Sequence, residues 1–140
     1  MSVAIEMSGL SKRFKRATAL EGVDLTVPEG AVFGFLGPNG AGKTTAIRIL
    51  TGLARPTNGS ARVFGHDVVS EPDQVRSLVG FLPDVPGYYP WMTAEQFLRL
   101  SGRLYGITGA LLDERVESLL DLAGLTGVET KVGGYSRGMK

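Results

Sequence analysis

Residues 31–53 read AVFGFLGPNGAGKTTAIRILTGL, and the rest of the chain is organised around this stretch. It opens with an uncharged apolar run at residues 31–36, which predicts a strand that is buried on both faces. A glycine-rich turn follows, and apolar residues then recur at helical spacing from Ala46 onwards. A strand, a G-x-x-x-x-G-K-S/T motif and a helix, in that order, predict a phosphate-binding loop.

The residue types of this motif suit a triphosphate. Glycines let backbone N–H groups wrap closely around an anion, and the start of a helix presents unpaired N–H groups with a partial positive charge. We expect Lys43 to reach the β- and γ-phosphates, Thr44 to offer its hydroxyl to Mg²⁺, and Thr45 to bond the α-phosphate. The candidate nucleotide-binding residues of the loop are Gly37, Pro38, Asn39, Gly40, Ala41, Gly42, Lys43, Thr44 and Thr45. A plain glycine turn with a surface lysine is the weaker reading, because the whole motif stands between a strand and a helix.

Composition bounds the class of protein. The 140 residues are 43% hydrophobic and 21% charged, as in one soluble globular domain. A net charge of +1 gives no argument for nucleic acid, and the basic cluster of Lys12, Arg13, Lys15 and Arg16 is expected to be a solvated strand end. The absence of cysteine excludes disulfides and thiolate metal sites. No signal pattern and no apolar run of about 20 residues is present. We therefore expect an intracellular protein whose membrane part, if any, belongs to another polypeptide.

Apolar periodicity predicts the remaining elements. Short strands are expected at residues 2–7, 20–27, 60–64 and 78–82, the first two forming an antiparallel layer beside a parallel core. Thr93 and Gln96 have the spacing of a capping box, which predicts a helix that ends near Gly106. A second helix is expected over residues 110–123. No strand separates these two helices, so they are predicted to form a small helical lobe.

Two side chains have more than one reading. The only histidine, His66, stands between Gly65 and Asp67, which favours turn chemistry over a catalytic role. Phe14 lies between two expected strands, and on burial habits alone such an aromatic is more often part of a core than a platform for a ligand.

The spelling GPNGAGKTT resembles the ATP-binding-cassette (ABC) family, the ATPase subunits of ABC transporters. Residues 10–14 (LSKRF) and 19–23 (ALEGV) are similar to the opening of that family, which makes Phe14 the expected adenine-stacking aromatic instead of a core residue. Residues 79–84 (VGFLPD) resemble the strand into the glutamine loop. Residues 90–95 (PWMTAE) resemble the start of the helical subdomain, and residues 135–139 (YSRGM) the signature usually written LSGGQ.

Two positions depart from the family pattern. Asp84 stands where the family has Gln or Glu, so contacts to Mg²⁺ and to the attacking water would use a shorter, charged group. In the signature, Arg137 and Met139 replace a glycine and the glutamine. Ser136 and Gly138 are kept, and the resemblance implies that they contact the γ-phosphate held by an opposite subunit. It also implies Lys43 and Asp84 as the catalytic residues of this part of the chain.

The resemblance implies an α/β fold, that of a P-loop NTPase of the ABC ATPase type. It would have an N-terminal antiparallel β layer, part of the parallel core sheet and a small helical lobe. We expect residues 1–140 to be the N-terminal portion of one nucleotide-binding domain. Residues 1–84 would form the β layer and the P-loop core, and residues 85–140 the helical subdomain.

The implied function is coupling of ATP binding and hydrolysis to transport across a membrane. The implied partners are ATP with Mg²⁺, a second ABC ATPase subunit in a head-to-tail dimer, and a membrane-spanning permease, with no nucleic acid. The subunit would lie in the cytoplasm at the inner face of the cell membrane, and the YSRGM spelling is similar to a subgroup associated with export.

In this family the Walker B aspartate, the water-polarising glutamate and a switch histidine follow the signature, where this sequence stops. We therefore expect these 140 residues to bind nucleotide weakly, to hydrolyse it little or not at all, and to self-associate through an open apolar edge. Two alternatives are a nucleotide-binding module without a hydrolytic role and a soluble ABC ATPase of DNA repair or translation. A small-molecule kinase would share the phosphate loop but not the signature-like tail.

Overall fold

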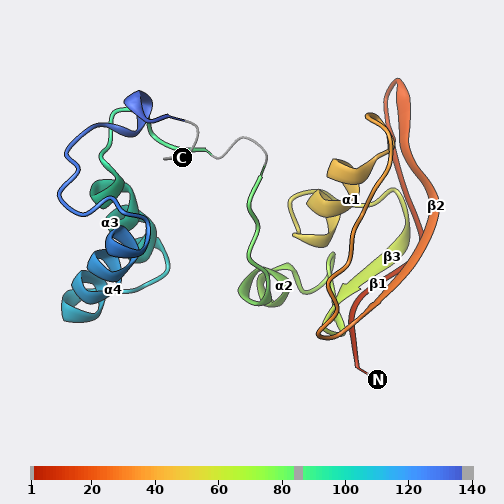
Figure 1. Cartoon of the computed structure of the whole chain (residues 1–140). Coiled ribbons are helices and arrows are strands. Elements are labelled where there is room, and N and C mark those ends of the chain that lie inside the picture. Colours follow the sequence, from red (N-terminus) through yellow and green to blue (C-terminus); the bar gives the residue numbers. More distant parts are fainter. Residues whose placement is uncertain (1, 84–86, 137–140) are drawn as a thin grey trace. The chain divides into compact units, whose positions relative to one another are not determined.

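The computed structural model describes residues 2–83 and 87–136 (Figure 1). Tertiary contacts divide the chain into two compact units, an N-terminal unit (Met1–Leu82) and a C-terminal unit (Pro83–Lys140). Asp84 and Gly138 of the expected site lie outside the described residues.

The N-terminal unit is built on a four-stranded antiparallel sheet. Its strands are β1 (Val3–Phe14), β2 (Ala17–Pro28), β3 (Asn58–Val63) and β4 (His66–Asp67). Their order across the sheet is β2-β1-β3-β4. The strands β1 and β2 form a long curved hairpin, which Figure 1 shows in red and orange. The antiparallel pairing of the first two strands is the arrangement that their alternating sequence predicts.

A bulge in β1 lets two residues of odd spacing, Met7 and Leu10, both face the core. Met7 and Leu10 are both buried although an uninterrupted strand would place them on opposite faces. Between them the register shifts, and Gly9 adopts a positive φ of 56°, which glycine tolerates without steric cost. The amide of Gly9 donates to Asp24 Oδ1 at 2.7 Å, so its hydrogen bond is not lost.

Two helices complete the N-terminal unit. They are α1 (Lys43–Leu50) and α2 (Pro72–Leu78), and α1 lies against the sheet beside β2 and β3 (Figure 1). Buried apolar side chains from the sheet, from both helices and from the segment between β4 and α2 form one core: Met7, Leu10, Leu20, Ala46, Ile49, Ala61, Val63, Val68 and Val75. Ala46 and Ile49 are the positions that α1 buries, whereas Ile47 and Leu53, which the helical spacing also places on the apolar face, are exposed.

The C-terminal unit contains the helices α3 (Ala94–Leu104) and α4 (Gly109–Leu122) and one short 3₁₀ helix, η1 (Val132–Gly134). The capping box at the start of α3 is confirmed: Thr93 Oγ1 accepts from the Gln96 amide at 3.2 Å, and Gln96 Oε1 accepts from the Thr93 amide at 3.0 Å. Arg99 on α3 donates to Asp113 on α4 at 2.5 Å and to Glu95 at 2.8 Å. These bonds raise the pKa of the guanidinium, the bond to Asp113 most.

A backbone tie joins the segment before α3 to the segment after α4. Thr93 and Lys131 form an antiparallel bridge. The amide of Val132 donates to the Met92 carbonyl at 2.8 Å, and the amide of Gly133 donates to the Pro90 carbonyl at 3.0 Å. This tie (residues 90–93 with 131–133) fixes the backbone just before the signature-like residues.

Two expected strands are wrong. Residues 31–36 form no strand. Val32 is fully exposed and Leu36 is 91% exposed, whereas Phe35 is half-buried and packs against the core. Residues 78–82 form no strand either: Leu78 ends α2, and Leu82 is 80% exposed. A central parallel strand needs hydrogen-bonding partners on both sides, and none of the described strands pairs with either segment.

Two further features bear on function. Within residues 2–83 and 87–136, no helix is long and apolar enough to cross a membrane.

His66 stands at the start of β4, where its Nδ1 lies 3.0 Å from Glu71 Oε1. The hydrogen bond with His66 lowers the pKa of Glu71. His66 thus belongs to a turn network, consistent with its expected role.

Candidate nucleotide-binding site

The phosphate loop is a chain of exposed backbone that ends in the helix α1. Gly40 and Gly42 adopt positive φ angles of 85° and 84°, and Gly42 is the N-cap of the helix. No side chain caps this end, so the first amides of α1 are free of the competing oxygen that most N-caps supply. Free amides at a helix start, preceded by glycines, are the arrangement that binds phosphate.

Strand β2 holds the loop in place. A Cβ atom at Gly42 would lie 2.1 Å from the carbonyl oxygen of Ala19 and 2.6 Å from Leu20 Cδ2. Leu20 is itself 4% exposed and belongs to the core. The turn from loop to helix is therefore pressed against the sheet, and no residue with a side chain fits at position 42.

The ammonium of Lys43 folds back over the loop. Its Nζ donates to the carbonyl oxygens of Gly37 at 2.5 Å and Pro38 at 2.7 Å. These contacts place the positive charge above the loop backbone, among the groups that would surround a phosphate. An anion that enters the loop would meet this ammonium directly and could replace the carbonyls as its partner.

Two hydroxyls follow the lysine. Thr44 is exposed and Thr45 is half-buried at the first turn of α1. Within the described part of the chain neither hydroxyl has a hydrogen-bond partner. Both are thus available to a ligand.

Magnesium has one candidate protein ligand in this part of the chain. The described residues contain no group of three His, Asp or Glu side chains that could hold a metal ion. Mg²⁺, however, usually keeps several waters and takes one or two protein oxygens together with phosphate oxygens. The Thr44 hydroxyl fits that mode of binding. The second expected ligand, Asp84, lies outside the described residues.

Phe14 is not a core residue. It ends β1, its side chain is 52% exposed, and the ammonium of Lys12 lies 5.2 Å from its ring centroid. Phe14 pairs with Ala17 on β2, two residues before Ala19, or about 7 Å along the strand. The same hairpin therefore carries Phe14, which is expected to stack on the base, and the residues that contact Gly42.

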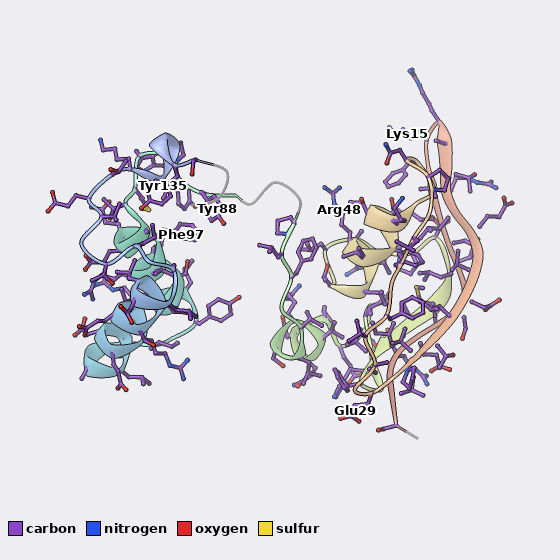
Figure 2. All side chains as sticks on the ribbon, viewed as in Figure 1. Lys15, Glu29, Arg48, Tyr88, Phe97 and Tyr135 are labelled. Carbon is purple, nitrogen blue, oxygen red and sulfur yellow. The ribbon has the colours of Figure 1, made fainter. Side chains whose placement is uncertain are left out.

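Ser136 lies in the C-terminal unit and is exposed. The residue before it, Tyr135, is 7% exposed, and its hydroxyl has no hydrogen-bond partner among residues 2–83 and 87–136. Figure 2 labels Tyr135 with Tyr88 and Phe97 of the same unit, and the rings of Tyr88 and Phe97 pack edge to face at 5.3 Å. The backbone tie ends at Gly133, three residues before Ser136.

Sequence reasoning missed two contributors to the site. Lys12 was grouped with a solvated strand end, yet its side chain is half-buried and bonded. The contact of Ala19 and Leu20 with Gly42 was also missed. No local pattern marks either role, because both depend on residues distant in the sequence.

Comparisons with known proteins agree with this geometry. The sequence profile of the ABC transporter family matches residues 20–140. A daunorubicin/doxorubicin resistance ATP-binding protein of Streptomyces peucetius is 46% identical over 98% of this chain. A bacitracin transport ATP-binding protein of Bacillus licheniformis is 35% identical over 100% of it.

A solved structure described as the ATP-binding subunit of an ABC transporter superposes with a TM-score of 0.79 at 30% identity, over 97% of this chain. The chain spans 42% and 45% of the length of the two relatives and 57% of that solved chain. The expected α/β fold of the ABC ATPase type is confirmed by this similarity, although residues 31–36 form no strand. The chain belongs to the ABC transporter family.

Proposed function

We propose that this chain is the N-terminal portion of one nucleotide-binding domain of an ABC transporter, and that its phosphate loop binds MgATP. The observation that carries the proposal is the uncapped start of α1 behind Gly40 and Gly42, with the Lys43 ammonium above the loop. Residues 1–84 would be the β layer and P-loop core, and residues 85–140 the helical subdomain.

Each part of the loop has a role in this proposal. The backbone from Gly37 to Gly42 surrounds the phosphates, and Lys43 compensates the charge on the β- and γ-phosphates. Thr44 binds Mg²⁺, which Asp84 would also contact, and Thr45 bonds the α-phosphate. Phe14 stacks on the adenine. Held by Thr44 and Asp84, Mg²⁺ would supply positive charge that neutralises the phosphates.

The whole protein is proposed to act as the ATPase of a membrane transporter that exports its substrate. Support comes from two similar proteins, named for daunorubicin/doxorubicin resistance and for bacitracin transport. Its partners would be a second ATPase subunit and a membrane-spanning permease. Ser136 and Gly138 would contact the γ-phosphate of the ATP that the second subunit holds. The subunit would then lie at the cytoplasmic face of the membrane.

We also propose that the 140 residues alone bind nucleotide without turning it over. Catalysis of phosphoryl transfer depends on a group that orients the attacking water. In this family that group is a glutamate that follows the signature motif, beyond residue 140. Binding needs only the loop, the helix start and Lys43.

Calorimetric titration of the chain with MgATP, with phosphate release followed on the same sample, tests both statements. We expect saturable binding without release. Lys43→Ala should weaken binding about 10- to 100-fold, since it removes charge-assisted hydrogen bonds. Lys131→Ala removes an equal charge from the C-terminal unit and should leave binding unchanged. Absence of binding in the unmodified chain would refute the first statement, and sustained phosphate release would refute the second.

A further inference from the structure

Lys12 connects the expected base platform to the segment that follows α1. Its Nζ lies 5.2 Å from the centroid of the Phe14 ring and donates a 2.7 Å hydrogen bond to the carbonyl oxygen of Arg55. One ammonium makes both contacts. The ring at the end of β1 is therefore linked, through a single side chain, to the turn after the phosphate-binding helix.

Backbone bonds reinforce this link. The amide of Thr57 donates to the Ser11 carbonyl at 2.8 Å, and the Thr57 hydroxyl accepts from the Arg13 amide at 3.0 Å. The end of β1 is thus fixed to the segment from Arg55 to Thr57 on both sides of Lys12. These hydrogen bonds hold the backbone on either side of Lys12 and so position its ammonium over the ring.

We propose that Lys12 is a positioning residue for the nucleotide base. A cation over an aromatic ring is attracted to its electron-rich face, so Lys12 holds the half-exposed Phe14 ring by one face and leaves the other for the base. Lys12 acts through Phe14, and the proposal rests on the proposed function, in which Phe14 stacks on adenine. A base stacked on Phe14 would then bind the same hairpin against which Gly42 of the phosphate loop packs.

The competing explanation is general electrostatic attraction, since Lys12 belongs to a basic cluster with Arg13, Lys15 and Arg16. Among the described residues, Lys12 is the one cation that lies over an aromatic ring. Figure 2 shows Lys15 extending from the hairpin tip into solvent. Lys15 therefore offers a matched control of the same charge.

The test compares the affinities of each variant for MgATP and for magnesium tripolyphosphate, which has the phosphates but no base. Lys12→Met keeps the aliphatic stem and removes the charge. We expect it to weaken MgATP binding about three- to fivefold and to leave tripolyphosphate binding unchanged. Lys12→Arg keeps a cation and should restore MgATP affinity to within about twofold. Lys15→Met should leave both affinities unchanged.

Equal weakening of both ligands by Lys12→Met would show a general charge effect and overturn the proposal, as would no change in either. Failure of the unmodified chain to bind MgATP would instead remove the proposed function, and with it this inference, before any variant is made. A nucleotide-free measurement gives an independent check. The Lys12 ε-methylene protons should show an upfield ring-current shift by NMR that Phe14→Leu abolishes, and its absence would overturn the ring contact.

Discussion

Gly42 and Ala19 touch backbone to backbone: a Cβ atom at Gly42 would come within 2.1 Å of the Ala19 carbonyl oxygen. This contact joins the start of α1 to β2, a strand that the chain completes before it reaches the loop. The conformation of the phosphate loop is thus a property of the hairpin as well as of its own glycines.

We expect Gly42→Ala to destabilise the N-terminal unit by at least about 3 kcal/mol, because a methyl group would meet the Ala19 oxygen and also force a positive φ on alanine. Gly40→Ala is the matched control: it has the same φ strain but nothing within 4 Å of its Cβ position. It should cost only about 1 kcal/mol. Hydrogen exchange of the amides of the N-terminal unit, measured in each variant, gives both losses of stability. Equal costs would mean that the contact with Ala19 relaxes freely.

Thr93→Ala should lower the stability of the C-terminal unit by about 1 kcal/mol, because it removes the side-chain acceptor of the capping box. Thr108→Ala provides the control. Thr108 occupies the N-cap of α4 but makes no side-chain cap hydrogen bond, so its removal should have little effect. Hydrogen exchange of α3 and α4 amides distinguishes the two. A larger loss from Thr108→Ala would contradict the cap assignment.

The turn before α2 should make the N-terminal unit sensitive to acid. Hydrogen bonds from the amides of Ser70 and Val69 lower the pKa of Asp67 from its ordinary 3.8, with a smaller contribution from Arg62. A lowered pKa means that the unfolded chain binds the proton first. The stabilisation is therefore complete above about pH 4 and is lost as the pH falls below that value. The urea midpoint of unfolding is measured at about five pH values between about 2.5 and 6. As the pH falls, the midpoint should decrease less steeply for Asp67→Asn than for the parent. Parallel curves would refute the role of Asp67.

The exposed segment 31–36 should make the chain self-associate. Val32 and Leu36 are largely open to solvent. Extended backbone that carries apolar side chains and has no strand partner readily pairs with another copy of the chain. Light scattering should therefore show a mass that rises with concentration, and Val32→Lys should reduce the rise. Val69→Lys places the same charge at another exposed valine and should not. A monomer at all concentrations would contradict this expectation.

Most of the features that the sequence predicts correctly have a local signal. The helix at Lys43 and the capping box of Thr93 and Gln96 depend on residues within one turn of each other, and both were predicted correctly. The helix α2 was missed although it carries Pro72 in its first turn, a recognised start signal. Its short length hides any periodicity.

Three other features could not be predicted because they depend on tertiary contacts. The state of residues 31–36 depends on whether strands lie on both sides, which no local pattern states. The bulge at Gly9 changes which residues of β1 face the core, so simple alternation fails there. Lys12 was misjudged because its partners, Phe14 and the Arg55 carbonyl, come together only in the folded unit.

The backbone tie between residues 90–93 and 131–133 sets an order of events in folding. The helices α3 and α4 are consecutive, so their contacts close a short loop, whereas the tie closes a longer one that contains both helices. Longer loops cost more entropy to close, and isolated helices form within about a microsecond. In pulse-labelling hydrogen exchange, helix amides should gain protection before those of Val132 and Gly133; the reverse order would contradict this. The backbone that precedes Ser136 would then be fixed only after both helices have formed.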